Sequence, residues 1–269
     1  MLREAMRKSG CAAVAALSLL PLASSAQGFA ALVSPPRFEL NGKPGAKLSE
    51  VMEITNAGAQ AAKYKLKTTD WTLSDDGAVK FDDALAVGSC RPWVAIERRE
   101  ITVGAGAKYR YRFEVTPPAG APAGECRFAI MIEGDEQPVQ TPNGPSFPIA
   151  GRLGVIVYVT LGDAQPSLEV TGTKVAPVNG VPVPVILVKN HGQAHGRITG
   201  FLSGTDASGK KLEFTPSTLP ILAGETRSIS LVPYGDKDEV VKIAFPITIK
   251  GKLEWGDKQS TPFEQTFSR

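Results

Sequence analysis

Apolar and polar residues alternate along much of the chain, which is the pattern of half-buried β-strands. In Lys108–Val115, two tyrosines, a phenylalanine and a valine share one face, while lysine, arginine and glutamate fill the other. Residues 126–133 repeat this arrangement with Phe128, Ile130 and Ile132 on one face. Turn-forming clusters at 74–77, 104–106 and 206–209 separate such runs at the spacing of antiparallel sandwiches. We therefore expect an all-β protein.

A weak internal repeat divides the chain in two. Residues 54–60 resemble 188–193, since each is a strand that ends in an Asn-x-Gly turn, and residues 101–106 resemble 220–224. Asn56 to Gly106 spans 50 residues and Asn190 to Gly224 spans 34, so the first half carries about 16 more, which we place in a hairpin around 71–90. The repeat predicts two β-sandwich domains in tandem, 27–162 and 163–269, joined near 162–166.

Composition narrows the class of protein. The 269 residues are 42% hydrophobic and 21% charged, and Gly 27 with Pro 21 occurs without a collagen period, so the chain is neither disordered nor fibrous. A formal net charge of +3 indicates no nucleic-acid partner.

The N-terminus has the pattern of a secretory signal. Arg3, Arg7 and Lys8 precede the apolar residues 11–22, and small residues follow before Gln27. The apolar stretch is shorter than the roughly 20 residues that cross a bilayer. We expect a cleaved signal peptide at 1–26, with cleavage after Ala30 as the alternative, and export of the mature chain.

Removal of that segment takes away Cys11 and leaves an even number of cysteines in an oxidising compartment. The favoured interpretation is a disulfide between Cys90 and Cys126. The rival, a catalytic cysteine, needs a nearby base, and the two histidines lie in the second half. His191 and His195 are interpreted as parts of a surface turn. No nucleophile and base can be assembled, so we predict neither an enzyme nor a metal, cofactor or small-molecule substrate.

One apolar strand and two arginines remain as functional candidates. Between Phe147 and Leu161 both faces of the predicted strand are largely apolar, which fits either a central strand or a strand that pairs with a partner by β-augmentation. Arg37 lies in an early strand, and Arg152 begins the last strand of the same domain. If these strands are neighbours, both guanidinium groups suit a carboxylate in the cleft between the domains.

The order of these elements resembles the PapD-like periplasmic chaperones of pilus and fimbrial assembly. The stretches that carry the resemblance are 32–40, 53–56, 92–96, 124–128 and 152–159. They cover nearly the whole mature chain and are clearest in the first half. The resemblance implies two immunoglobulin-like domains in an L-shaped pair that cap pilus subunits by donor-strand complementation without ATP.

The resemblance also implies site residues and partners. The partners would be pilus or fimbrial subunits and an outer-membrane assembly platform. Arg37 would bind the subunit's terminal carboxylate with Arg152, because Gly154 stands where the family pattern has lysine. The subunit-binding residues would be Phe147, Ile149, Leu153, Val155 and Val157. The alternative is an exported adhesion or envelope-scaffold module of two immunoglobulin-like domains.

Overall fold

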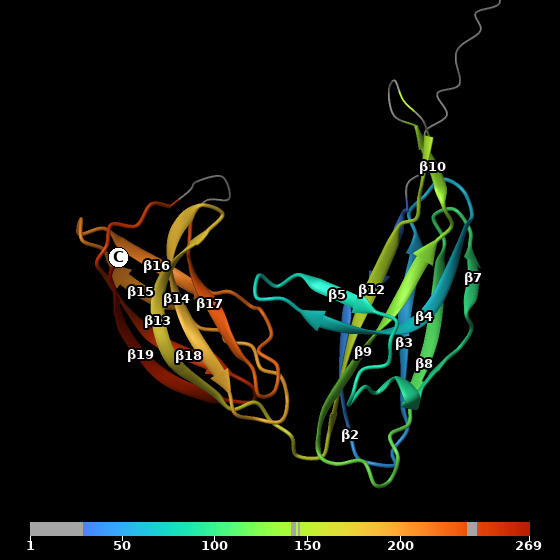
Figure 1. Cartoon of the computed structure of the whole chain (residues 1–269), viewed down its shortest axis with the longest axis horizontal. Helices are drawn as coiled ribbons and strands as arrows, with labels where there is room; N and C mark the ends of the chain where they lie inside the picture. Colours follow the sequence, from blue (N-terminus) through green and yellow to red (C-terminus); the bar gives the residue numbers. More distant parts are fainter. Residues whose placement is uncertain (1–28, 141–143, 145, 236–240) are drawn as a thin grey trace, which may run out of the picture.

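The computed structural model describes residues 29–140, 144, 146–235 and 241–269. The predicted signal peptide at 1–26 and Cys11 lie outside these residues. Within them the regular secondary structure is β-strand apart from one short 3-10 helix, η1 (Arg91–Trp93), and no helix has the length and apolarity to cross a membrane. The all-β prediction is confirmed, and Figure 1 shows two groups of strands that meet at one end.

The first domain is a sandwich of two main sheets. One has the strand order β1-β3-β8-β6, and the other the order β2-β12-β9-β4-β5, with β7 also paired to β4. Buried side chains from both sheets form a single core, in which Phe38, Phe113 and Phe128 pack edge to face. The strands are β1 (Ala31–Ser34), β2 (Arg37–Gly42), β3 (Leu48–Asn56), β4 (Ala62–Leu73), β5 (Val79–Asp82), β6 (Val94–Ile96), β7 (Glu100–Val103), β8 (Lys108–Val115), β9 (Gly124–Gly134), β10 (Gln137–Gln140), β11 (Ser146–Ile149) and β12 (Arg152–Leu161).

The first strand of the chain changes sheets. β1 pairs antiparallel with β3, and after Pro35 and Pro36 the chain continues as β2, which pairs parallel with β12 in the opposite sheet. Proline cannot donate a ladder hydrogen bond, so two successive prolines favour a break between strands at this point. The change of sheet places Arg37 beside the last strand of the domain.

The second domain is one continuous strand path with the order β13-β14-β17-β16-β15-β18-β19. Its first and last strands, β13 and β19, come close together, so the path encloses a second core centred on Ile186, Phe214 and Ile249. The strands are β13 (Leu168–Val178), β14 (Val181–Asn190), β15 (Leu202–Thr205), β16 (Lys211–Pro216), β17 (Thr226–Pro233), β18 (Ile247–Trp255) and β19 (Gln259–Phe267).

The internal repeat has a structural cause in two buried asparagines. Asn56 donates through Nδ2 to the Val103 and Gly104 carbonyl oxygens at 3.0 and 3.2 Å, and its Oδ1 accepts from the Gly58 N–H at 3.0 Å. Asn190 likewise donates to the Ile221 carbonyl oxygen at 2.9 Å and accepts from a glycine N–H two residues on. In each domain the asparagine therefore ties the first repeated motif to the second, because buried polar groups must find partners.

Candidate functional site

β12 has a neighbour on both sides along only part of its length. It pairs with β9 over Arg152–Leu161, but with β2 only from Ile156 to Leu161. In the described part of the chain, residues 152–155 therefore have a strand on one side only. This is a free sheet edge, whose N–H and C=O groups are available to another strand.

The free edge continues into a protruding hairpin. β10 and β11 extend β9 and β12 beyond the sandwich, and Figure 1 shows this hairpin standing clear of both domains. Phe147 and Ile149 on β11 are 53% and 54% exposed. Side chains two residues apart lie on one face of a strand, so the hairpin presents a pair of apolar side chains to solvent.

The other predicted subunit-binding residues are buried in this protein's own core. Val155 and Val157 are fully buried, and Leu153 packs partly buried against the same cluster. Their side chains therefore do not face solvent, and a part in subunit binding, which stays a prediction, would use the backbone of the free edge. The physical reason is that β12 crosses the middle of the sandwich, so every second side chain faces the opposite sheet.

The second apolar face of β12 is covered by the β4–β5 hairpin. Tyr158 packs edge to face on Trp71 of β4, and Phe81 of β5 lies over Gly154 so closely that a Cβ at residue 154 would overlap its ring. Leu222 from the second domain joins this cluster. Gly154 thus admits the Phe81 ring, and a lysine there would displace it.

The β4–β5 hairpin also contacts the second domain directly. Arg227 of β17 is 2% exposed and donates through Nη1 to the Ser74 carbonyl oxygen at 2.7 Å and through Nη2 to that of Leu73 at 3.4 Å. The same guanidinium group pairs with Glu225. Figure 1 shows the hairpin reaching from the first domain toward β17. The additional residues that the repeat predicted for the first half therefore include a hairpin that contacts the second domain.

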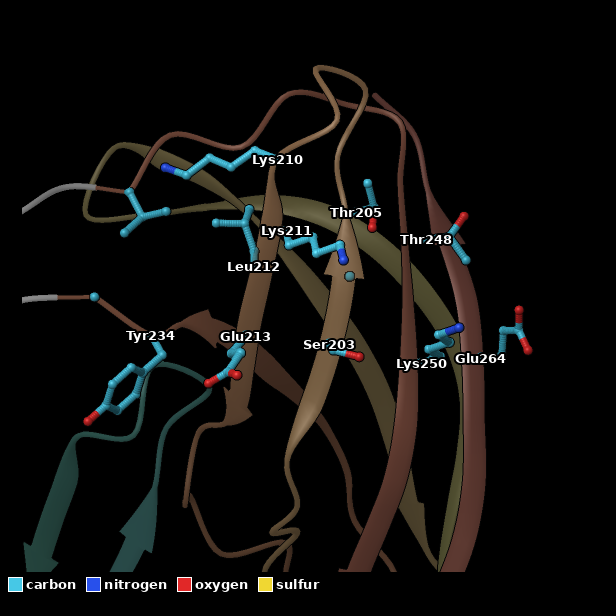
Figure 2. Close-up of a pocket in the computed structure, with 13 residues that line it drawn as sticks. Ser203, Thr205, Lys210, Lys211, Leu212, Glu213, Tyr234, Thr248, Lys250 and Glu264 are labelled. Atoms are coloured by element: carbon cyan, nitrogen blue, oxygen red, sulfur yellow. The ribbon is translucent and has the colours of Figure 1, made fainter.

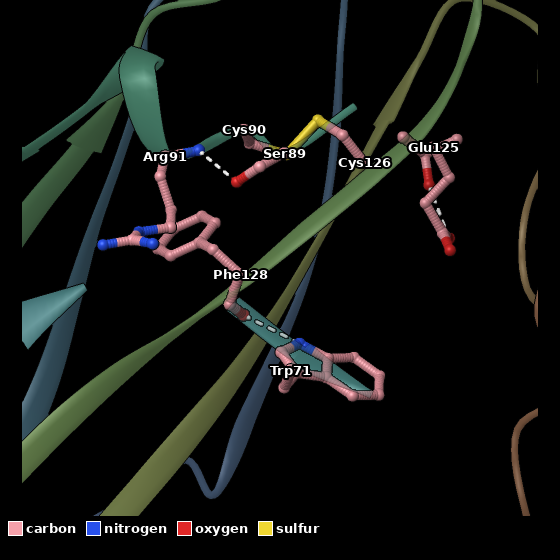
Figure 3. Close-up of a disulfide and its surroundings, with 8 residues drawn as sticks. Trp71, Ser89, Cys90, Arg91, Glu125, Cys126 and Phe128 are labelled. Atoms are coloured by element: carbon pink, nitrogen blue, oxygen red, sulfur yellow. Dashed lines mark hydrogen bonds between the residues drawn. A yellow bond between two sulfur atoms is a disulfide. The ribbon is translucent and has the colours of Figure 1, made fainter. Parts of the chain in front are cut away.

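Cys90 and Cys126 form the predicted disulfide, shown in Figure 3. The bond joins the segment before η1 to the start of β9, with Cα atoms 5.5 Å apart. Two residues beyond Cys126, the Phe128 carbonyl oxygen accepts from Trp71 Nε1 at 3.2 Å. The disulfide and this hydrogen bond both fix β9 against the segment that carries the β4–β5 hairpin.

The two predicted carboxylate-binding arginines lie apart. Arg37 is opposite Ile156 in the parallel register, four residues beyond Arg152, which at about 3.3 Å per residue is roughly 13 Å along the strand. Arg37 lines a cavity between the domains, whereas the exposed Arg152 lines a different hollow with Lys65 and Glu133. The structure therefore does not bring the two together.

The cavity at Arg37 contains groups that the sequence reasoning missed. It has a volume of about 250 Å³ and is lined by Arg37 and Glu39 of β2, Thr160 of β12, and the 194–197 segment of the second domain. Arg37 Nε donates to Glu39 Oε1 at 2.7 Å. Burial raises the pKa of Glu39, but the Arg37 hydrogen bond and the charges of His195, Arg37 and Arg197 outweigh it and lower that pKa below its ordinary value.

His195 forms a contact between the domains. Its ring stacks on Tyr158 with centroids 3.8 Å apart, and its Nδ1 lies 2.6 Å from Glu125 Oε2. The described residues contain no cluster of three or more metal-ligating side chains. The predicted surface position holds for His191, whose side chain is 52% exposed, but not for His195, whose side chain is 9% exposed and whose partner Glu125 precedes it by 70 residues. Two residues this far apart in the sequence form no local motif, so the Glu125–His195 pair could not be predicted from spacing.

A larger cavity, with a volume of about 770 Å³, lies on the outer sheet face of the second domain. Figure 2 shows its lysines and glutamates spread along β16, β18 and β19 rather than converging on one point. This is the usual solvated face of a sheet, and we assign no binding site to it.

Comparisons with known proteins give structural likeness only. No protein-family model and no characterised sequence matches the chain. Solved structures of fimbrial chaperones do match the fold of the chain. The YadV chaperone shares 10% identity over 88% of this chain and 99% of its own, with a TM-score of 0.48. The E. coli chaperone DraB shares 12% over 90% and 98%, with a TM-score of 0.45. A chain of the Salmonella enterica SafA pilin complex with the SafB chaperone shares 11% over 89% and 97%, with a TM-score of 0.44. The resemblance seen in the sequence is to this same class of proteins.

Proposed function

We propose that this chain is a periplasmic chaperone of pilus or fimbrial subunits, which caps a subunit by donor-strand complementation without ATP. The observation that carries the proposal is the free edge that runs from β11 into residues 152–155, together with the exposed Phe147 and Ile149. An outer-membrane assembly platform stays a prediction from the resemblance.

The edge supplies what an incomplete sandwich lacks. A subunit with a missing strand exposes an apolar groove and unpaired backbone groups, and both favour aggregation. An added strand pairs with that backbone and fills the groove with alternate side chains. Pro148 provides no N–H, so this strand has one ladder donor fewer. All of the stabilisation comes from the contacts formed, and no step needs a nucleotide.

The packing of Phe29 supports cleavage of the signal after Ala26. The Phe29 ring lies edge to face with Tyr64 at 6.0 Å between centroids and fits against Gly134 and Gly151, where β9 and β12 lead into the hairpin. Cleavage after Ala30 would remove this ring from the base of the proposed donor strand. N-terminal sequencing of the exported protein distinguishes the two.

The test follows the alternation of side chains along β11. Tagged protein is purified from the periplasm of its natural host, and each co-purifying protein is identified and examined for an immunoglobulin-like domain that lacks a strand. Phe147→Ala and Ile149→Ala should each lower recovery of that subunit at least tenfold, because truncating a fully buried phenylalanine costs about 3–5 kcal/mol. Ala150→Ser, on the opposite face, is the matched control.

Circular dichroism of the free variants separates binding from folding. Because both side chains are about half exposed in the free protein, the variants should keep the parent's spectrum and melting temperature. If Phe147→Ala unfolds the free protein, or if recovery is the same in all three variants, the proposed donor strand is wrong.

A further inference from the structure

Phe29, at the start of the described chain, is fixed where β9 and β12 lead into the β10–β11 hairpin. Gly134 and Gly151 pair at this point, and the Gly134 N–H donates to the Gly151 carbonyl oxygen at 3.0 Å. A Cβ at either glycine would overlap the Phe29 side chain, so both positions admit the ring only because they lack one. The ring also lies edge to face with Tyr64. The N-terminal end of the chain therefore begins from a defined point on the first domain.

A cavity of about 210 Å³ lies beside Phe29. The turn after β3, the start of β4 and the end of β9 form its walls, with Tyr64 and Asp135 among the lining residues. A space of this size holds several water-sized groups. It is separate from the cavity between the domains, which contains none of these residues.

Two polar groups of this cavity are incompletely paired. Tyr64 is 1% exposed, and its hydroxyl oxygen is buried with no hydrogen-bond partner in the described part of the chain. Buried polar groups nearly always find a partner, so this hydroxyl indicates that one is missing. Asp135 has only a long contact of 3.9 Å to Lys65 Nζ, and the Lys63 ammonium, which belongs to another lining residue, is paired with Glu100 at 2.8 Å. The cavity therefore offers a carboxylate and a hydroxyl to a small cationic donor.

Signal cleavage creates such a donor next to the cavity. Cleavage after Ala26, which is part of the proposed function, leaves Gln27 and Gly28 ahead of Phe29. These two residues lie outside the described part of the chain. Two residues span at most about 7 Å, so the new terminus stays close to the cavity that Phe29 lines. An α-amino group is mostly protonated at neutral pH, whereas in the precursor the same nitrogen belongs to an uncharged peptide bond.

We propose that this cavity binds the mature N-terminus of the chain, with the α-ammonium group of Gln27 against the Asp135 carboxylate and the Tyr64 hydroxyl. The contact ties the N-terminus to β4 and to the end of β9, at the base of the β10–β11 hairpin. The precursor cannot form it, because the ammonium group arises only on cleavage. Processing of the signal therefore completes the base of the proposed donor strand.

The reactivity of the α-amine tests this contact. An N-hydroxysuccinimide ester of acetic acid, used at about pH 7, acetylates the unprotonated amine and releases N-hydroxysuccinimide, and lysine amines react less because they are more fully protonated. Peptide mapping by mass spectrometry gives the rate at Gln27. The folded mature chain should react about tenfold more slowly than the same chain in urea, since an ion pair and a hydrogen bond must both break. Asp135→Asn should raise the folded-state rate about 2–5-fold, as expected for loss of one partly exposed ion pair. Glu136→Gln removes the adjacent exposed carboxylate, which does not line this cavity, and is the matched control.

A second measurement uses the Tyr64 hydroxyl and does not depend on amine chemistry. Tyr64→Phe should lower the melting temperature of the mature first domain by about 2–5 °C, as loss of one buried hydrogen bond predicts. In a chain with two alanines inserted before Gln27, which move the ammonium group away, the same substitution should have no effect. Equal melting temperatures for tyrosine and phenylalanine in the mature chain would overturn the proposal.

The outcomes separate this inference from the proposed function. A mature chain whose sequence begins at Ala31 refutes the proposed cleavage and removes the occupant. A chain that begins at Gln27, and whose α-amine reacts equally fast in the parent and in Asp135→Asn, refutes the docking alone. Cyclisation of Gln27 with loss of ammonia, seen by intact mass, also overturns it, because no ammonium group would remain. Neither measurement involves a subunit, so failure to capture one refutes the chaperone function and leaves the result at the N-terminus unchanged.

Discussion

Removal of the disulfide should destabilise the first domain by an amount that depends on the length of the loop that the bond closes. The bond joins Cys90 to Cys126 across 36 residues. Closing a loop of that length lowers the entropy of the unfolded chain by about 13 cal/mol/K, which is about 3.8 kcal/mol at 25 °C. The double variant Cys90→Ala/Cys126→Ala should lose at least this much, because Cys90 is fully buried in the core and its sulfur is lost as well.

Calorimetry measures the effect. For a domain of roughly 130 residues, 1 kcal/mol corresponds to about 3–4 °C, so the melting temperature of the first domain should fall by about 10–15 °C. The transition of the second domain should move much less, since both cysteines belong to the first core. The parent protein measured in reductant is the matched control and should show nearly the same loss.

Two results would refute this reasoning. Intact-mass analysis of unreduced protein that finds two alkylated thiols would mean that the bond does not form. A double variant within 1 kcal/mol of the parent would mean that the unfolded chain is already restricted and that the loop-entropy argument does not apply.

Three further predictions concern the domain contact and the second core. Gly154→Lys should displace the Phe81 ring and lower stability by about 1–3 kcal/mol in urea denaturation, and Phe81→Ala should restore part of the loss. Arg227→Ala should cost about 2–3 kcal/mol in the same assay, since it removes charged hydrogen bonds to the β4–β5 turn. The Ser208 hydroxyl and nearby backbone N–H groups lower the pKa of Asp206 to about 2. A carboxyl whose folded-state pKa is depressed stabilises above its unfolded pKa, so the second domain should weaken as pH falls from about 4 to about 2, and Asp206→Asn should flatten that dependence in pH-resolved denaturation.

Local patterns in the sequence were sufficient for the fold class and for many of the strands. Alternation in Lys108–Val115 became β8, whose Tyr111, Phe113 and Val115 are buried. Period-2 alternation reports which face of a strand is covered, and that is a local property of the sequence. The repeated Asn-x-Gly motifs were equally informative, because the asparagine in each bonds within its own domain.

The site depends on pairing between distant segments, which local patterns do not encode. The sequence suggested that Arg37 and Arg152 lie on neighbouring strands, but it did not give the register of those strands. In the structure an offset of four residues places the two side chains in different cavities. His195 looked like a turn residue because its partners, Tyr158 and Glu125, lie in the other domain. Strand order and register decide such contacts, and neither follows from the periodicity of one strand.

The β4–β5 hairpin explains both the additional residues of the first half and the two apolar faces of β12. A strand that is apolar on both sides must be covered on both sides, since exposed apolar area is unfavourable. The core covers Val155 and Val157, and the β4–β5 hairpin covers Gly154 and Tyr158. The same hairpin accepts hydrogen bonds from Arg227, so the cover of β12 is also a link to the second domain. The β4–β5 hairpin therefore helps to hold β12 in position against the second domain.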